Sequence, residues 1–333
     1  MERINYFDFL KGIAIILVVM GHITEKSMEI TTSLFNHLYS SFHMPLFIVI
    51  SGFLCFKHSQ FTLFDLINFI YKKILRIILP FLSIGFIYGL WNFHNPIDGL
   101  INKFQGLWFL PTIFYCMVIS YIALYISKII CNNINIHLNI CLLGLIWITS
   151  YTIYIVYHPI VPYYLHYIKM FPYFAFGIIL AQNNQWYNSI LNNKILFTIS
   201  IIFYTIILTL NESLSALGNF NIAVFFAIII LFQLCKQDSN NFLYKKITQI
   251  GRFSIEIYLF HWFLLPSLPT IGKWLTQNIS TDGMPINNGN LIIIIIICLT
   301  VSIPIIISCI YITYIIKKSS LLSFFILGIP MKK

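Results

Sequence analysis

Long apolar runs make up most of the chain, and short polar stretches separate them. A helix needs about 20 apolar residues to cross the hydrocarbon core of a bilayer, because it rises about 1.5 Å per residue. By this measure the pattern predicts ten spans. The predicted spans are residues 7–24, 36–56, 74–93, 108–130, 138–157, 163–181, 195–210, 219–235, 253–274 and 291–316. The predicted fold class is therefore all-α: a polytopic transmembrane helical bundle in which residues 1–333 form a single domain.

Basic residues are distributed unevenly between the two sides that ten spans create. Sixteen of the twenty Lys and Arg residues fall on the side that carries both termini. Short cytoplasmic loops are enriched in Lys and Arg, so we expect both termini to be cytoplasmic. The same rule accounts for the net charge of +10, and nucleic-acid binding is not expected.

Composition supports the membrane class. The 333 residues are 59% hydrophobic and 9% charged, with a mean hydropathy of +0.86. The first apolar run ends at Met20-Gly21-His22 without a small-x-small cleavage site, so we expect an uncleaved first span. The seven cysteines form no C-x-x-C pair and are interpreted as apolar fillers, so no metal site is expected.

The first span carries two ionisable side chains. Lys11 and His22 are eleven residues apart, which is three helical turns plus about 20°, so both leave the same face of the helix. They are separated by about 16 Å along the axis. Ionisable residues inside a membrane are costly and indicate function. The pattern predicts a polar track from one leaflet toward the other.

The predicted topology groups further polar residues with these two. The inner cluster consists of basic residues and their counter-ions: Lys11, Lys72, Lys73, Arg76 and Arg252, with Asp8 and Glu256. The outer cluster consists of His22 and His43, with His261 below them. A neutral imidazole, with a pKa of about 6.5, is suited to taking a proton from a hydroxyl. A cationic pocket suits phosphates.

Together the clusters fit a donor with a charged head and a long thin arm that carries its reactive end to the histidine. Acyl-CoA has that shape. A proton-coupled transporter also uses intramembrane His, Lys and Glu, so these residues alone leave both functions open.

The basic and acidic candidates each have an ordinary structural explanation. Lys11 can snorkel to the inner headgroups, and Arg76 can be a positive-inside anchor. Glu256 can be an i,i+4 partner of Arg252.

The histidines differ in how easily a structural role explains them. His43 can satisfy carbonyls freed by Pro45, and His261 can form a hydrogen bond across the bundle. His22 is the hardest to explain structurally, because it lies several turns from the inner interface and follows Gly21.

Several motifs resemble those of the integral-membrane acyltransferases of acyltransferase family 3, with fucose 4-O-acetylase-like and polysaccharide O-acetyltransferase members most similar. The matching segments, in order, are Asp8 to Ala14 with His22, Phe42 to Phe47 with Ser51-Gly52-Phe53, Lys73 to Pro80, Leu107-Trp108-Phe109, Tyr173-Phe174 with Phe176-Gly177, and Ser254-x3-Tyr258-Leu259-x-His261. Lys73 departs from the arginine often found there, which keeps the charge and loses the bidentate fork.

The resemblance implies that His22 is catalytic and that Lys11 and Arg76, with Lys73 beside them, contact the acyl-CoA head. Some members of the family carry a fused extracytoplasmic domain, and we expect a stand-alone form here. We therefore expect an O-acyltransferase, most simply an O-acetyltransferase of the bacterial inner membrane. It would use cytoplasmic acetyl-CoA and a hydroxyl of a surface glycan or lipid-linked sugar.

The remaining site residues are expected to support the reaction: Asp8, His43, Trp108 (with Phe109 as an aromatic wall), Glu256 and His261. The expected partners are acyl-CoA, the glycan acceptor and membrane lipid, with no permanently bound cofactor and no metal. The alternative is a polysaccharide or lipid-linked sugar transporter without its own chemistry. Transfer of succinyl or another acyl group stays open, as do the identity of the sugar and an acyl-enzyme intermediate.

Overall fold

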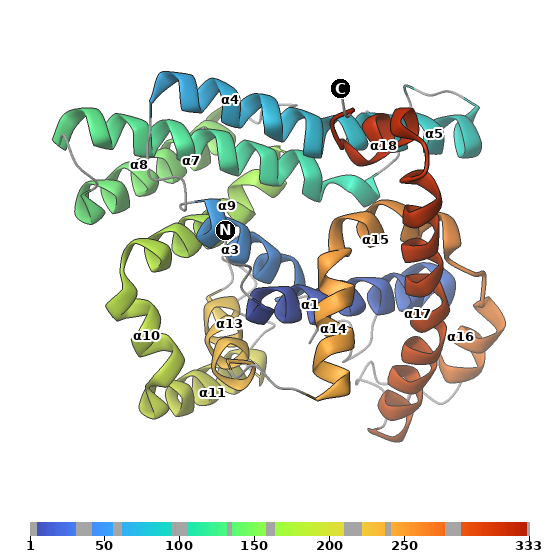
Figure 1. Cartoon of the computed structure of the whole chain (residues 1–333). Coiled ribbons are helices and arrows are strands. Elements are labelled where there is room, and N and C mark those ends of the chain that lie inside the picture. Colours follow the sequence, from blue (N-terminus) through green and yellow to red (C-terminus); the bar gives the residue numbers. More distant parts are fainter. Residues whose placement is uncertain are drawn as a thin grey trace. The chain divides into compact units, whose positions relative to one another are not determined.

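The structure is a computed structural model. It describes residues 5–30, 42–55, 62–94, 97, 105–131, 135–157, 164–209, 222–236, 241–276 and 288–331. Every regular element in these ranges is a helix (Figure 1). The predicted all-α class is confirmed for this part of the chain.

Five helices are long and apolar enough to cross a membrane. They are Asn5–Ser27, Leu63–Trp91, Phe109–Cys131, Ile136–Val156 and Ile292–Ile316. A sixth results if Asn184–Asn192 and Lys194–Ile207, which are bent by 72° relative to each other, form one broken span. The number of about ten spans and the side of the termini stay predictions. Parts of four predicted spans lie outside the described residues, namely 36–41 with 56, 163, 210 and 219–221.

The third predicted span is longer than its apolar run. The sequence predicts this span at 74–93. The helix begins earlier, with α4 (Leu63–Lys73), and continues through a π-helical segment, η2 (Ile74–Ile78), into α5 (Leu79–Phe93). The side chain of Thr62 caps the start by accepting a hydrogen bond from the backbone N–H of Asp65. The early start was missed because α4 is amphipathic rather than uniformly apolar.

The ninth predicted span, 253–274, is wrong as a continuous helix. It contains α15 (Ser254–Phe260), a 3₁₀ turn η5 (His261–Leu264), an extended stretch, and α16 (Pro269–Thr276). Pro266 and Pro269 explain the break, because proline lacks the N–H that a continuing helix requires and restrains the residue before it.

The chain forms two compact units. The first contains Met1–Leu46 and Ile230–Ile315, and the second contains Phe47–Ile229 and Ile316–Lys333. The helices of the first unit are α1 (Asn5–His22), π-helical η1 (Ile23–Ser27), α14 (Phe242–Arg252), α15, η5, α16 and α17 (Asn288–Ile316), with the start of α3 (His43–Cys55) and the end of α13 (Ala223–Leu234).

The second unit holds most of the remaining helices. They are α4, η2, α5, η3 (Gln105–Leu107), α7 (Phe109–Cys131), α8 (Ile136–Tyr157), α9 (Tyr164–Gln182), α10 (Asn184–Asn192), α11 (Lys194–Thr209) and α18 (Ser320–Leu327), with the other parts of α3 and α13.

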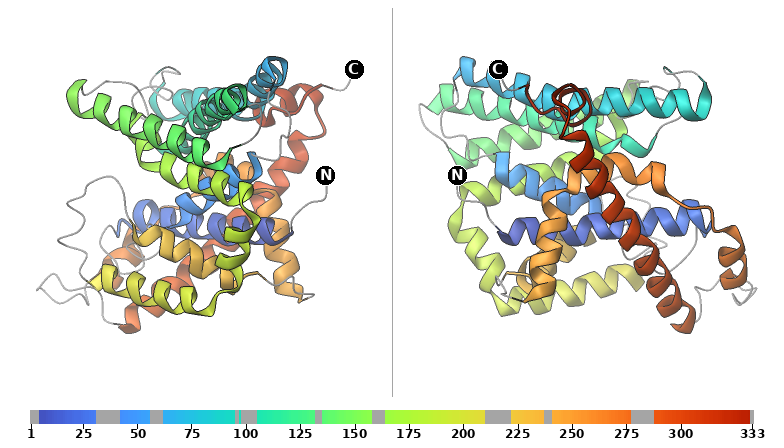
Figure 2. Two further views of the ribbon diagram at one scale, coloured as in Figure 1. Left: turned by 90° about the vertical axis from the view of Figure 1, so that its left-hand side faces the viewer. Right: turned by 45° about the vertical axis from the view of Figure 1, so that its right-hand side comes forward.

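In the first unit, α14 crosses α1 at very short range (Figures 1 and 2). A Cβ added to Gly12 would lie 2.1 Å from the carbonyl oxygen of Ile247, and one added to Gly251 would lie 1.7 Å from the carbonyl oxygen of Asp8. Only glycine permits this backbone approach, so the two glycines fix where the helices cross.

The start of α1 is held by aromatic residues of the same unit. The hydroxyl of Tyr6 donates to the carbonyl oxygen of Phe232 at 3.1 Å, and the rings of both pack with that of Phe7. On the next turn, Phe9 stacks on Tyr244 of α14 at 4.3 Å between ring centroids. These contacts place the N-terminal turn of α1 beside α13 and α14.

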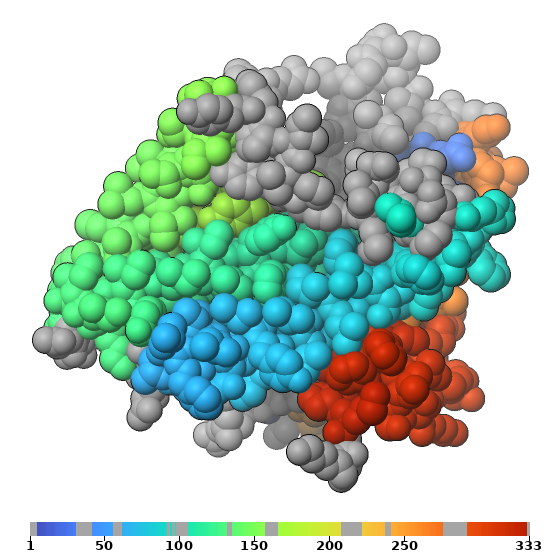
Figure 3. Space-filling view, turned by 90° about the horizontal axis from the view of Figure 1, so that it is seen from above, coloured from blue at the N-terminus to red at the C-terminus, as the bar shows by residue number. Residues whose placement is uncertain are grey.

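In the second unit, α3 and α9 also cross through glycines. A Cβ on Gly52 would lie 2.1 Å from the carbonyl oxygen of Phe174, and one on Gly177 would lie 2.1 Å from that of Val49. Figure 3 shows α18, in red, against the blue-to-cyan helix of α4 and α5.

Candidate active site

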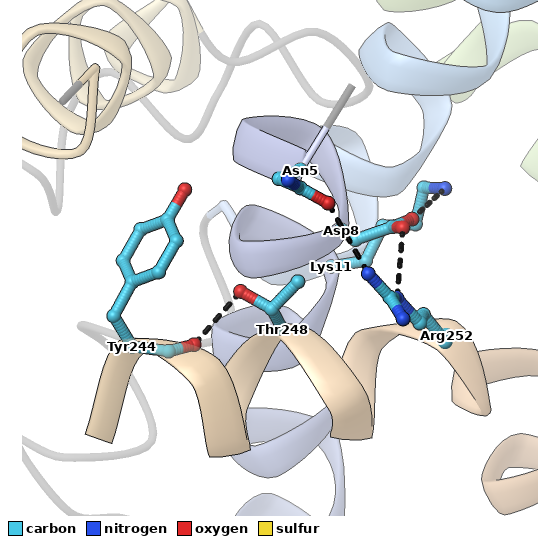
Figure 4. Close-up of polar contacts among 6 residues, drawn as sticks. All are labelled: Asn5, Asp8, Lys11, Tyr244, Thr248 and Arg252. Carbon is cyan, nitrogen blue, oxygen red and sulfur yellow. Dashed lines mark hydrogen bonds and ion pairs between the residues drawn. The ribbon is translucent and has the colours of Figure 1, made fainter. Parts of the chain in front are cut away.

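An ion network surrounds the first turns of α1 (Figure 4). Asp8 Oδ1 accepts a hydrogen bond from Lys11 Nζ at 3.2 Å, and Asp8 Oδ2 lies 3.6 Å from Arg252 Nε. Arg252 Nη2 also donates to Asn5 Oδ1 at 3.2 Å. Asp8 is only 3% exposed, so its buried charge is balanced by the two cations.

The network leaves donors for a further anion. The side chain of Lys11 is 21% exposed and that of Arg252 is 45% exposed. Lys11 Nζ has three N–H donors and Arg252 has five, so the contacts to Asp8 and Asn5 do not use all of them. These contacts place two cations beside the Asp8 carboxylate at this end of α1.

α1 is an uninterrupted helix from this network to His22. The spacing of eleven residues between Lys11 and His22 therefore corresponds to about 16 Å, as predicted from the sequence. Immediately after His22 the backbone becomes π-helical over η1. The hydroxyl of Thr24 donates to the Gly21 carbonyl oxygen at 2.7 Å, and the N–H of Leu268 donates to the Ser27 carbonyl oxygen at 2.8 Å.

Four aromatic side chains cluster at the end of α1. The rings of His22 and His261 are 5.3 Å apart between centroids and 20° from parallel. Trp262 packs on His22 at 4.5 Å, and Tyr258 lies 5.8 Å from His261. His43, from the start of α3, and Lys26, from η1, are near enough to interact electrostatically with His22. The three predicted histidines are therefore brought together within the first unit.

α15 connects the two ends of this site. α14 ends at Arg252, beside Asp8, and α15 leads from Ser254 to His261, beside His22. α15 packs on α1 and runs in the same direction. Glu256 lies buried on α15 at 3% exposure. Residues almost 250 positions apart thus line one face of α1.

Arg76 belongs to the second unit and lies in the π-helical η2. Its Nη1 donates to the carbonyl oxygen of Leu327 at 2.6 Å, so it binds the C-terminal end of α18. A cation there also favours the negative end of the helix dipole. Gly328 follows at φ +61°, and an added Cβ would lie 1.9 Å from the Leu75 carbonyl oxygen. Arg76 therefore stabilises the contact between α18 and η2.

Lys73 and Trp108 are the other predicted site residues in the second unit. Lys73 Nζ lies 5.3 Å from the ring centroid of Phe69, a cation–π contact. Trp108 stacks on His166 at 4.4 Å and meets Phe109 edge to face at 6.2 Å. The predicted roles of Lys73, Arg76 and Trp108 in substrate binding stay predictions.

Within the described ranges, no group of three or more His, Cys, Asp or Glu side chains is arranged to hold a metal ion. Two contacts were missed by sequence reasoning. Trp262 packs on His22, and Arg252 pairs with Asp8, whereas the sequence favoured Glu256 as its partner. The only local signal for Trp262 is its position directly after His261.

Apolar helices of spanning length and a histidine cluster around the fully buried His261 define an integral membrane protein with a polar site in its first unit. Residues 4–309 match the acyltransferase domain of family 3, so the chain belongs to that family. The chain is also 48% identical over 54 residues to nodulation protein NolL of Sinorhizobium fredii, a match that spans 14% of each protein. No solved structure matches the chain at a significant level.

Proposed function

We propose that the protein is a membrane O-acyltransferase that moves an acetyl group from cytoplasmic acetyl-CoA to a hydroxyl of a surface glycan or lipid-linked sugar. Membership of the acyltransferase family supports the reaction class. One structural observation carries the proposal: an ion network around Asp8 lies at one end of α1, and His22, packed on the fully buried His261, lies at the other. We also propose that the protein lies in the bacterial inner membrane with both termini in the cytoplasm.

The two ends of α1 have separate roles in this proposal. Lys11 and Arg252 bind phosphate groups of the donor, because cations with N–H donors bind phosphate through charge-assisted hydrogen bonds. The donor's long arm carries the thioester along α1 to His22. Asp8 holds the two cations at a fixed position until the anion binds.

The chemistry at His22 is general base catalysis. The imidazole takes the proton of the acceptor hydroxyl, while the hydroxyl oxygen forms a bond to the thioester carbonyl carbon. The carbon–sulfur bond then breaks, and CoA leaves as a thiolate that receives the proton from His22. The products are the O-acetylated sugar and free CoA. In this proposal His43, which interacts electrostatically with His22, contacts the acceptor as well.

The direct test is transfer of radiolabelled acetyl from acetyl-CoA to glycan by the purified protein in lipid nanodiscs. His22→Gln keeps a polar side chain but removes the base, so the rate should fall by about 100-fold or more. His137→Gln makes the same change at an exposed histidine of α8 and should leave the rate unchanged. A His22→Gln protein with the wild-type rate would remove His22 from the mechanism.

NMR of surface glycan from cells with and without the gene distinguishes the enzyme from a transporter. Loss of O-acyl signals with unchanged glycan yield supports the acyltransferase. Loss of the glycan with unchanged substitution supports export instead. The chemical shifts also identify the acyl group, acetyl or succinyl.

A further inference from the structure

Two ring nitrogens in the histidine pair lack a hydrogen-bond partner among the residues that the structure describes. They are Nδ1 of His22 and Nε2 of His261. The side chain of His261 is completely buried, with 0% exposure. Buried polar atoms in proteins nearly always have a partner, so two such atoms on adjacent rings require an explanation.

The proton position on His261 follows from a hydrogen bond to the backbone of α15. Its Nδ1 lies 3.0 Å from the carbonyl oxygen of Ile257, one turn earlier. A carbonyl oxygen only accepts, so Nδ1 of His261 carries the proton. In the neutral ring Nε2 is then a lone pair, and it can only accept.

The position of the two rings fits a hydrogen bond between them. Their centroids are 5.3 Å apart and their planes differ by 20°. Two imidazoles joined by an N–H···N bond in their common plane have centroids about 5 Å apart, the sum of about 2.9 Å between nitrogens and two ring radii. The observed separation is therefore within reach of such a bond, and reorientation of the stacked His22 ring would direct its Nδ1–H to Nε2 of His261.

We propose that His261 is a positioning residue for His22: its Nε2 accepts a hydrogen bond from Nδ1–H of His22, which leaves Nε2 of His22 as the base. The catalytic role of this hydrogen bond rests on the proposed function. The bond identifies Nε2 as the ring nitrogen of His22 that takes the proton, which the sequence leaves open.

The other neighbours of His22 fit this role less well. The indole of Trp262 and the ammonium of Lys26 have only N–H donors, so neither accepts a proton from Nδ1. His43 has an acceptor nitrogen but also has an interaction of its own. Only His261 combines a completely buried position with a ring nitrogen that is held as an acceptor.

The arrangement resembles other catalytic bases that a third group orients. The hydroxyl proton moves to Nε2 of His22, and the bond from Nδ1–H to His261 stabilises the imidazolium that forms. The Ile257 carbonyl holds His261 in turn. The proton passes from Nε2 to the departing thiolate, so His261 is chemically unchanged after each cycle.

The kinetic test compares two substitutions in the full-length protein in nanodiscs. His261→Phe keeps a flat ring but removes the acceptor, so kcat should fall about 10-fold or more while the KM for acetyl-CoA stays within about two-fold. His261→Gln supplies an amide oxygen that accepts from Nδ1–H and should restore part of the lost kcat. Wild-type kcat in His261→Phe, or equal loss in both variants, would overturn the proposal.

A spectroscopic test does not depend on activity. Protein labelled with ¹⁵N-histidine is measured by NMR at alkaline pH, where imidazoles are neutral, and His22→Gln identifies the His22 signals. The wild type should show a protonated Nδ1 and an unprotonated Nε2 at His22, and His261→Phe should give mixed tautomers. A protonated Nε2 in the wild type would contradict the inference. If the wild type transfers no acyl group, the proposed function fails while this test still decides the role of His261.

Discussion

Asp8 determines the arrangement of the cations at the start of α1. It is 3% exposed and contacts both Lys11 and Arg252. The family resemblance implied a donor-binding role for Lys11, and the predicted topology made Asp8 a counter-ion of the whole inner cluster. The sequence did not show which cations Asp8 contacts, because its contact with Arg252 joins two helices that are distant in the sequence.

Arg252→Gln is predicted to weaken donor binding. The variant removes one of the two cations and the bond to Asn5. Because the side chain is 45% exposed, solvent screens its charge, and the expected loss is about 1 kcal/mol, or about a five-fold higher KM for acetyl-CoA. The measurement is initial rate against acetyl-CoA concentration.

Lys245→Gln is the control for this prediction. It removes the same charge from an exposed position of the same helix, α14. Its KM should equal that of the wild type. A similar rise in both variants would mean that general surface charge, rather than the network at Asp8, attracts the donor.

Within each unit, two helices cross through glycines. The crossing in the first unit sets the geometry of the candidate site. Gly12 and Gly251 let α1 and α14 approach at backbone distance, and Arg252 follows Gly251 directly. Sequence analysis did not predict this crossing, since the partner of a glycine face depends on how the helices pack.

Gly251→Ala is predicted to destabilise the protein. The new Cβ would lie 1.7 Å from the Asp8 carbonyl oxygen, so α1 and α14 have to separate. Overpacking of this kind costs about 1–3 kcal/mol. The expected result is a lower Tm in detergent and a lower rate of acyl transfer, because Arg252 moves away from Asp8.

Gly144→Ala on α8 is the matched control. Nothing lies within 4 Å of a Cβ added there. Alanine in an open helix position should leave Tm unchanged or raise the stability by about 0.5–1 kcal/mol. Equal Tm values for the two alanine variants would show that the α1–α14 crossing tolerates separation.

For the whole molecule, the sequence predicts ten spans with both termini in the cytoplasm. The structure contains five helices of spanning length, or six with the bent pair, among the described residues. The membrane class followed from the sequence because the bilayer imposes one apolar length on every span. The break after His261 was missed because a span was inferred from apolar length across two prolines, Pro266 and Pro269.

The predicted topology can be tested by cysteine labelling in intact cells. In a background without the seven native cysteines, Ile97→Cys should react with a membrane-impermeant maleimide, because it lies in a predicted outer loop. Lys236→Cys should react only after lysis, because it lies on the predicted inner side. Labelling of Lys236→Cys in intact cells would contradict the predicted orientation.

The sequence by itself determined that the chain is helical and belongs in a membrane, because apolar length and helical rotation are local properties. It also determined that Lys11 and His22 lie on one face of one helix, about 16 Å apart. Only the tertiary structure decided their neighbours, Arg252 through Asp8 at one end and His261 at the other. Those contacts depend on how closely α14 crosses α1 and on where α15 ends. The local pattern of residues does not determine either feature, because both depend on packing between segments that are distant in the sequence.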